Sequence, residues 1–265
     1  MSAYDRIAAL YDPWSASVVE DIDFYVDEAV RSGGPVLELA VGTGRIAIPT
    51  ARAGIRVTGV DSSAGMLAVA RERAAQAGVE LDLRLGDLRD PPVEERFGLV
   101  TIPFRSLLHM ETDADRRAAL RAVRARLVEG GRFVFDVFTP APDDIADTHG
   151  RWLEREPGIF ERADWDERRR TLVLHVAGEG GAEAELTLAW LPVEEWRALL
   201  EEEGFVVEGL YGWFDRTPYA GQEDSIWVCR RAEEPGAGGG ADAPPAHSGS
   251  TGSPTRTRPG ASTSR

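Results

Sequence analysis

Residues 36–61 read VLELAVGTGRIAIPTARAGIRVTGVD, and this stretch decides the fold. An apolar run meets a turn containing Gly42 and Gly44, a helix-like segment follows as far as Gly54, and a second apolar run ends on Asp61. Glycine allows a sharp turn and the close approach of a ligand, because it carries no Cβ atom. The pattern predicts the first half of a nucleotide-binding βαβ unit.

The residues around this turn indicate which kind of nucleotide site it is. Asp61 lies 17 residues after Gly44, about where an acid that binds ribose hydroxyls is expected. The third glycine of G-x-G-x-x-G is missing, and Glu38 precedes the turn. The pattern E-x-A-x-G-x-G, followed by an acid at the end of the next strand, resembles motifs I and II of the class I S-adenosylmethionine (SAM)-dependent methyltransferases. The resemblance covers residues 4–231, and the bacterial small-molecule members, such as amino-sugar N-methyltransferases, are the most similar type.

The resemblance implies an α/β fold. Its Rossmann-like sheet has seven strands in the order 3-2-1-4-5-7-6, with the last strand antiparallel. Apolar runs predict strands at 35–39, 55–60, 79–85, 97–102, 132–138, 205–214 and 225–231. Helical patterns predict helices at 44–53, from Ser62 or Ser63 to Gly78, from Thr112 or Asp113 to Gly130-Gly131, and from Pro192 to Gly204.

Residues 140–190 interrupt the alternation of strands and helices. A loop begins at Pro140, and strand-like pieces follow at 152–156, 159–165, 171–177 and 183–190. We expect an antiparallel insertion after the fifth strand that roofs a substrate pocket. Six of the seven tryptophans lie at or after Trp152, and aromatic rings suit planar or cationic ligands. Trp152 and Trp213 are candidate substrate contacts, although such rings also form the core of an insertion.

Residues 1–34 precede the sheet and have a helical pattern that Pro13 is expected to break. In the resembled family a segment of this kind forms a lid over the SAM site, and Tyr11 matches the tyrosine that approaches the methionine end. The alternative is that the aromatic residues of this segment only pack it onto the domain. Residues 35–231 then form the SAM-binding domain.

The resemblance also implies which residues bind the cofactor. Glu38 supports the glycine turn or the SAM ammonium group, Asp61 holds the ribose, and Asp87 with Leu88 reads the adenine. In the resembled family the residue at the place of Met66 lies against the adenine ring; the alternative is that Met66 is a plain core residue. Ala40 replaces the first glycine that is common in the family, which limits how closely the ligand approaches. The full predicted cofactor set is Tyr11, Glu38, Ala40, Gly42, Gly44, Asp61, Ser62, Met66, Asp87, Leu88 and Phe104.

The candidate catalytic residues are His109 and Tyr11, which would face the transferring methyl group. His109 follows the fourth predicted strand, at the edge where parallel sheets bind ligands, and an imidazole titrates near neutral pH. The alternative is a histidine that only shapes the pocket. Arg105 is a candidate to bind an anionic substrate group, or forms an internal ion pair.

Composition narrows the function. The net charge of −15 argues against non-specific nucleic-acid binding. No apolar run is long enough to span a membrane, no signal peptide is visible, and the single cysteine, Cys229, excludes an internal disulfide. These features favour the cytoplasm. The histidines lack metal-site spacing, so no metal is expected. Residues 232–265 form a tail that is expected to be disordered, because residues 235–265 contain no Leu, Ile, Val, Phe, Trp or Tyr.

The sequence therefore favours an enzyme that transfers a methyl group from SAM to a nitrogen or oxygen of a small molecule, leaving S-adenosylhomocysteine. The resemblance suggests a secondary metabolite as acceptor, with neither nucleic acid nor membrane as partner, and a monomer or homodimer. Two alternatives remain open at this point. One is a SAM-binding regulatory or partner protein without turnover, and the other is an NAD(P)-dependent oxidoreductase.

Overall fold

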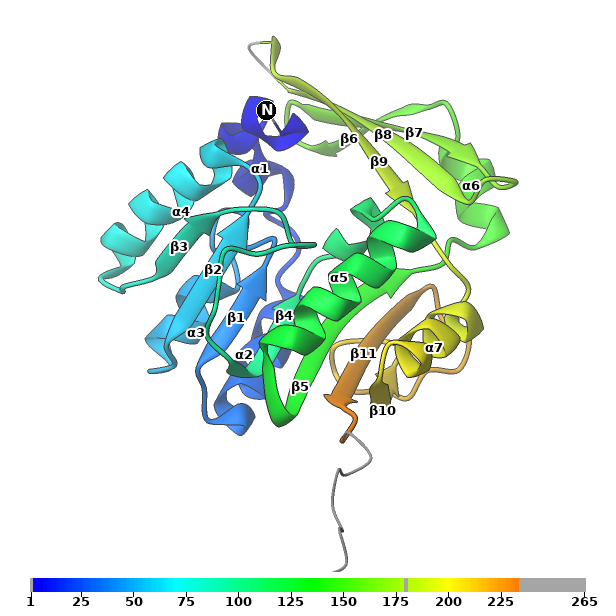
Figure 1. Cartoon of the computed structure of the whole chain (residues 1–265). Coiled ribbons are helices and arrows are strands. Elements are labelled where there is room, and N and C mark those ends of the chain that lie inside the picture. The colour runs from blue at the N-terminus through cyan, green and yellow to red at the C-terminus, as the bar shows by residue number, and fades with distance from the viewer. Residues whose placement is uncertain (1, 179–180, 234–265) are drawn as a thin grey trace, which may run out of the picture. The chain divides into compact units, whose positions relative to one another are not determined.

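A twisted sheet forms the centre of the protein, as the computed structural model shows for residues 2–178 and 181–233 (Figure 1). Within these residues its seven strands run in the order β10-β11-β5-β4-β1-β2-β3. They are β1 (Val36–Leu39), β2 (Val57–Asp61), β3 (Asp82–Leu85), β4 (Phe97–Ile102), β5 (Leu127–Phe138), β10 (Phe205–Tyr211) and β11 (Asp224–Arg231). Strand β11 pairs antiparallel with both β5 and β10. The predicted strand order is therefore confirmed.

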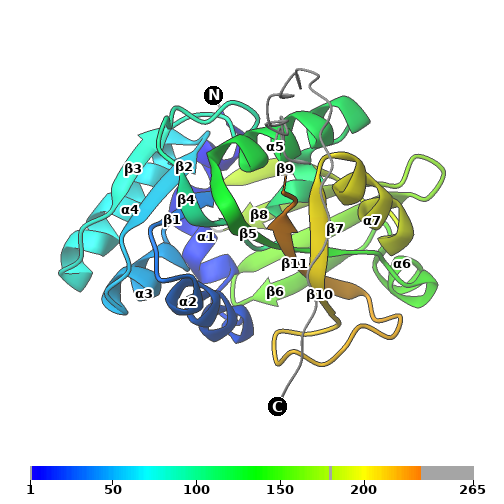
Figure 2. The same ribbon diagram turned by 60° about the horizontal axis from the view of Figure 1, so that its bottom comes forward.

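Helices cover both faces of this sheet (Figures 1 and 2). Helices α5 (Asp113–Arg126) and α7 (Val193–Glu202) pack on one face. Helices α2 (Glu20–Ser32), α3 (Ala47–Arg52) and α4 (Ala64–Ala77) pack on the other. The predicted cap of α4 is confirmed, because the Ser63 side chain accepts from the Met66 N–H and Gly78 ends the helix in the left-handed conformation.

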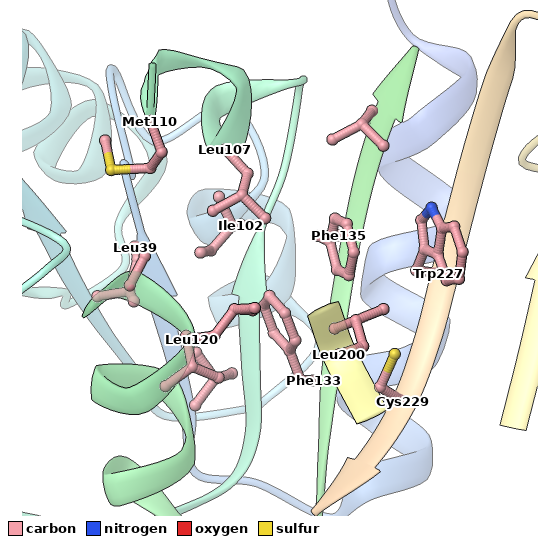
Figure 3. Packing of buried hydrophobic residues seen from close by; sticks show 14 of the residues in the cluster. Leu39, Ile102, Leu107, Met110, Leu120, Phe133, Phe135, Leu200, Trp227 and Cys229 are labelled. Carbon is pink, nitrogen blue, oxygen red and sulfur yellow. The ribbon is translucent and has the colours of Figure 1, made fainter. Parts of the chain in front are cut away.

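The strands bury both of their faces, as their continuous apolar sequences predict. Along β5, Phe133 and Phe135 pack toward α5 and α7, whereas Val134 between them packs toward α2. Figure 3 shows Phe135 stacked near Trp227, at a ring-centroid distance of 5.9 Å. Cys229 is fully buried in the same cluster, as expected for a core residue.

A second sheet lies at the carboxyl ends of the central strands (Figure 1). It consists of β6 (Trp152–Glu156), β7 (Ile159–Asp166), β8 (Thr171–Gly178) and β9 (Glu183–Ala189), paired antiparallel in that order. The predicted antiparallel insertion is thus confirmed. Strand β9 contacts two short 3₁₀ helices, η1 (Ala3–Arg6) and η2 (Ser106–His109).

Several predicted boundaries were wrong. Gly130-Gly131 does not end a helix but lies within β5, where the pairing with β4 shifts register and Gly130 has a φ of 70°. Pro13 does not break the first helix, because α1 (Ala8–Trp14) ends one residue later. The segment after Pro140 includes a short helix, α6 (Pro142–Thr148).

Strand β3 is shorter than predicted. It begins at Asp82 and lies at the sheet edge, so its alternating leucines are not all covered and Leu85 is 58% exposed. Within the described residues, no helix is long and apolar enough to cross a membrane. The predicted tail lies, from residue 234 onward, outside the described residues.

Candidate active site

Two cavities adjoin at the carboxyl ends of the central strands, beneath the second sheet. The strand-end cavity, of about 370 Å³, is lined by the turns after β1, β2, β3 and β4 and by η1. The roof cavity, of about 320 Å³, is lined by α1, α6 and the strands of the second sheet. Five residues line both cavities: Tyr4, Tyr11, Phe104, His109 and Leu186. We call this shared region the junction.

The glycine turn and Asp61 form the floor of the strand-end cavity. The Asp61 carboxylate accepts hydrogen bonds from the Gly42 N–H (2.8 Å) and the Ser63 N–H (2.8 Å). Burial raises the pKa of Asp61, although these two hydrogen bonds oppose that effect. A Cβ atom on Gly42 would meet no atom within 4 Å, so this backbone is open to a ligand. Ala40 has a φ of 57°, which explains why glycine is common at this position.

Nine of the eleven predicted cofactor residues line the strand-end cavity, namely Tyr11, Ala40, Gly42, Asp61, Ser62, Met66, Asp87, Leu88 and Phe104. Gly44 and Glu38 are not among its lining residues. Glu38 is buried behind the turn, and burial raises its pKa to about 8. Its contact with the Ala47 backbone suits the predicted role of supporting the turn.

Asp87 is placed at the end of β3 but has a partner already. Its carboxylate lies 2.6 Å from the Arg89 guanidinium, and this interaction holds its pKa below the usual value. The pair is half-exposed, so its net contribution to stability is small. A ligand that bonds to Asp87 would share or displace Arg89.

Residues 5–21 are held against the strand-end loops by polar contacts. Asp5 accepts from the Ser63 hydroxyl (2.6 Å) and the Gly65 N–H (3.0 Å). Asp12 accepts from the Thr43 hydroxyl (2.6 Å). Further along, Asp21 forms a bidentate, buried ion pair with Arg45, with both distances at 2.6 Å. These contacts place the tyrosines of η1 and α1 over both cavities.

At the junction, His109 lies between two hydrogen-bonding partners. Its Nδ1 atom is 3.0 Å from the Thr187 carbonyl oxygen, and its Nε2 atom is 2.8 Å from the Tyr4 hydroxyl. Burial lowers the pKa of His109 and raises that of Tyr4, so both side chains are neutral near pH 7. The predicted candidate His109 therefore lies at the junction, where both of its ring nitrogens are within hydrogen-bonding distance of a partner.

A strained turn after β4 positions Phe104. Phe104 and Arg105 both adopt the left-handed conformation, with φ values of 57° and 60°. Their N–H groups donate to the two oxygens of Asp136, at 2.7 and 2.9 Å, and the Tyr25 hydroxyl donates to the same carboxylate at 2.5 Å. Asp136 interrupts an apolar strand and is 2% exposed, and these three donors supply the partners that a buried carboxylate needs.

The roof cavity has an apolar wall and a charged rim. Leu172, Leu174, Leu186 and Leu188, from β8 and β9, form part of the wall. Arg105 lies at the rim, where it pairs with Asp224 (2.7 Å) and lies over the Phe138 ring. The predicted Arg105 is thus both a lining residue and part of an ion pair.

Two predicted substrate contacts lie outside these cavities. Trp152 is 50% exposed on β6, and Trp213 is 41% exposed beside Phe214. Neither lines the strand-end or the roof cavity. Tyr4, Trp14 and Trp165 line the roof cavity instead, and sequence reasoning did not single them out as site residues. No signal in the sequence distinguishes these rings from ordinary packing aromatics.

The chain is similar in sequence to known methyltransferases. Residues 36–131 match a family described as "Methyltransferase domain". The chain is 29% identical over 136 residues to a putative methyltransferase of Geobacillus sp. (strain WCH70), and the match covers 51% of this chain and 54% of that protein. The chain therefore spans about half the length of that relative.

Two further proteins are similar over nearly their whole length. The cypemycin N-terminal methyltransferase of a Streptomyces species is 25% identical over 235 residues, which cover 86% of this chain and 94% of that protein. The solved structure of the CcbJ methyltransferase from Streptomyces caelestis is 28% identical with a TM-score of 0.77, over 88% of this chain and 99% of that one. The similarity therefore extends well beyond residues 36–131.

Proposed function

We propose that the protein transfers the methyl group of SAM to a nitrogen or oxygen of a small molecule, and the match of residues 36–131 to a methyltransferase domain supports this. The junction carries this proposal. A ligand in the strand-end cavity and another in the roof cavity would meet at Tyr4, Tyr11, Phe104 and His109. Methyl transfer depends mostly on aligning a nucleophile with an activated carbon and on excluding water. Two adjoining cavities beneath the second sheet would hold the two ligands in this way.

The strand-end cavity is lined by groups that suit the ribose and the adenine of SAM. Asp61 would bind the ribose hydroxyls, because two backbone N–H groups hold its carboxylate in place and leave further lone pairs available. Met66 and Leu88 would contact the adenine, and Gly42 would allow the ligand close to the backbone. The volume of about 370 Å³ lies within the usual range for cofactor pockets, roughly 300–1,000 Å³. When bound, SAM supplies a methyl group made electrophilic by its sulfonium.

The roof cavity favours a small acceptor with an apolar body. Its volume of about 320 Å³ is at the lower end of the same range, and its wall is rich in leucine and aromatic side chains. The relative named as an N-terminal methyltransferase supports nitrogen as the accepting atom. We propose that the acceptor is a secondary metabolite, that no nucleic acid or membrane takes part, and that the protein works in the cytoplasm as a monomer or homodimer.

The lid role of residues 1–34 belongs to the same proposal. Tyr4 and Tyr11 line both cavities and come from the first two helical segments, so movement of this segment would open the site to solvent. The direct polar contacts of Asp5 and Asp12 with the cofactor-binding loops would close it.

The test is transfer of labelled methyl from SAM to pooled small amines and phenols, with binding of S-adenosylhomocysteine measured by calorimetry. Label in an amine or phenol supports the proposal and identifies the accepting atom. Binding without transfer to any acceptor would favour a non-catalytic SAM-binding protein. An absence of binding would contradict the proposal and return attention to a nicotinamide cofactor. Trp213→Phe is a suitable control variant, because Trp213 lies outside both cavities.

A further inference from the structure

The hydrogen bonds around His109 determine which of its nitrogen atoms carries the proton. The Thr187 carbonyl oxygen can only accept, so Nδ1 must be the protonated nitrogen that donates to it at 3.0 Å. In a neutral imidazole the other nitrogen then has a free lone pair. The Tyr4 hydroxyl, 2.8 Å from Nε2, must therefore donate to His109.

This arrangement leaves the Tyr4 oxygen, and not His109, with acceptor capacity at the junction. The hydroxyl hydrogen of Tyr4 is directed at Nε2, while its oxygen lone pairs remain available to another donor. An acceptor in the roof cavity would find the lone pair of Nε2 already occupied. Within the described residues, none of the five side chains shared by the cavities is a carboxylate, an arginine or a lysine. Of these five side chains, only Tyr4, Tyr11 and His109 carry a group that can take up or pass on a proton.

We propose that Tyr4 and His109 form a proton relay, in which Tyr4 takes the proton of the methyl acceptor and passes its own proton to His109. This inference rests on the proposed methyl transfer and deepens it. The bond between the acceptor atom and its hydrogen breaks, and its electron pair stays on that atom, which has become bonded to the methyl carbon. The proton moves to the Tyr4 oxygen as the Tyr4 hydroxyl proton moves to Nε2. The bond between the methyl carbon and the sulfur of the donor would break and leave its electron pair on sulfur. The positive charge of the sulfonium would thus be replaced by that of the His109 imidazolium, so charge and atoms balance.

The relay specifies the class of acceptor. The accepting atom must carry a hydrogen, as in a primary or secondary amine or a hydroxyl group, and a tertiary amine or thioether would not use the relay. Burial of His109 lowers its pKa, which favours later release of the proton to water and resets the site. Tyr4 is partly buried and lies edge-on to the imidazole, at a ring-centroid distance of 5.5 Å, so packing helps to hold its hydroxyl in place.

The decisive variants are Tyr4→Phe, His109→Asn and the double variant, assayed with an acceptor that the wild-type protein methylates. General acid–base catalysis contributes about 10²–10⁴-fold, so each single variant should lower kcat at least about 10²-fold. The double variant should lose little more, because two members of one relay act as a unit. Tyr219→Phe is the matched control, since Tyr219 packs against the main core and lines neither cavity. Its kcat should remain within about twofold of wild type.

Two further measurements separate a relay from a structural role. Raising the pH above the pKa of a phenolic acceptor, about 10, removes its proton without help, so the deficit of Tyr4→Phe should shrink there. Tyr11, Asp61, Glu111 and Glu185 also line the strand-end cavity, but they are present in every variant, and their effect cancels in the comparison. Independently of activity, ¹⁵N NMR of His109 should show a proton on Nδ1 and none on Nε2.

The outcomes distinguish failure of this inference from failure of the proposed function. A wild-type protein that methylates nothing would overturn the proposed function, and the relay with it. An active wild type with Tyr4→Phe within about threefold of its kcat would overturn the relay alone. Multiplicative losses in the double variant, or a neutral His109 protonated on Nε2, would overturn it as well.

Discussion

Asp136 offers the sharpest test of how the fold positions the site. Its carboxylate accepts hydrogen bonds from the N–H groups of Phe104 and Arg105 and from the Tyr25 hydroxyl. We expect Asp136→Ala to release the left-handed turn and to move the Phe104 ring away from the junction. Tyr25→Phe is the matched control, because it removes one donor and leaves both backbone contacts of the turn in place.

The expected change in stability is smaller than three lost hydrogen bonds suggest. Hydrogen bonds to a charged group contribute about 1.5–3 kcal/mol each. Against this, burial raises the pKa of Asp136 from 3.8 to about 6, so ionising it in the folded protein costs about 3 kcal/mol at neutral pH. The released turn also recovers about 1–2 kcal/mol for each left-handed residue. We therefore expect a net loss of about 1–3 kcal/mol in the free energy of unfolding, and about 1 kcal/mol for Tyr25→Phe.

Activity should separate the two variants far more than stability does. Displacement of a positioning group by about 1 Å can cost about 10²-fold in rate. We expect Asp136→Ala to lower kcat by about that factor, and Tyr25→Phe by less than about threefold. Denaturant unfolding and methyl-transfer kinetics on the same preparations provide the comparison. Equal losses of kcat in the two variants, or an unchanged kcat in folded Asp136→Ala, would refute the positioning role.

Three other predictions concern neighbouring groups. Burial raises the folded-state pKa of Glu38 to about 8, so the stability that the protonated side chain contributes is full below pH 4.5 and is lost as the pH rises through 8. Glu38→Gln should remove this pH-dependent loss in the free energy of unfolding, measured in urea from pH 5 to 9. Because the pKa of His109 is lowered, the acid limb of the kcat profile should lie below about 6.5, the ordinary pKa of histidine, and a limb above that value would contradict a neutral imidazole. Asp5→Asn weakens the contacts with Ser63 and Gly65, so S-adenosylhomocysteine should bind several-fold more weakly in calorimetry. Unchanged binding would show that this contact does not hold the lid.

The sequence predicted the sheet and most of the strand-end cavity because local patterns encode them. Gly42, Asp61 and Asp87 each follow an apolar strand, and parallel strands bring their carboxyl ends to one edge. The turn residues at the start and end of α4 were equally readable, since capping depends on residues adjacent in the chain.

The remainder of the site depends on contacts between distant parts of the chain. Tyr4 and His109 are 105 residues apart, and nothing local to either one indicates their hydrogen bond. Trp152 was predicted as a substrate contact because it lies in the insertion, but strand alternation directs side chains to both faces of a sheet, and only one face lines the roof cavity. Without knowledge of the pairing between sheets, the correct face cannot be chosen.

Backbone strain is concentrated where the two cavities are built. Ala40, Phe104 and Arg105 are three of the five described non-glycine residues with positive φ, and each lines at least one cavity. Such conformations cost about 1–3 kcal/mol each and persist only where surrounding contacts enforce them. For Phe104 and Arg105 the enforcing contact is the buried Asp136 carboxylate, which itself is costly to ionise. A fold selected for stability alone would have little reason to combine two strained residues with a buried charge, so the arrangement is best understood as fixing the aromatic ring between the two cavities.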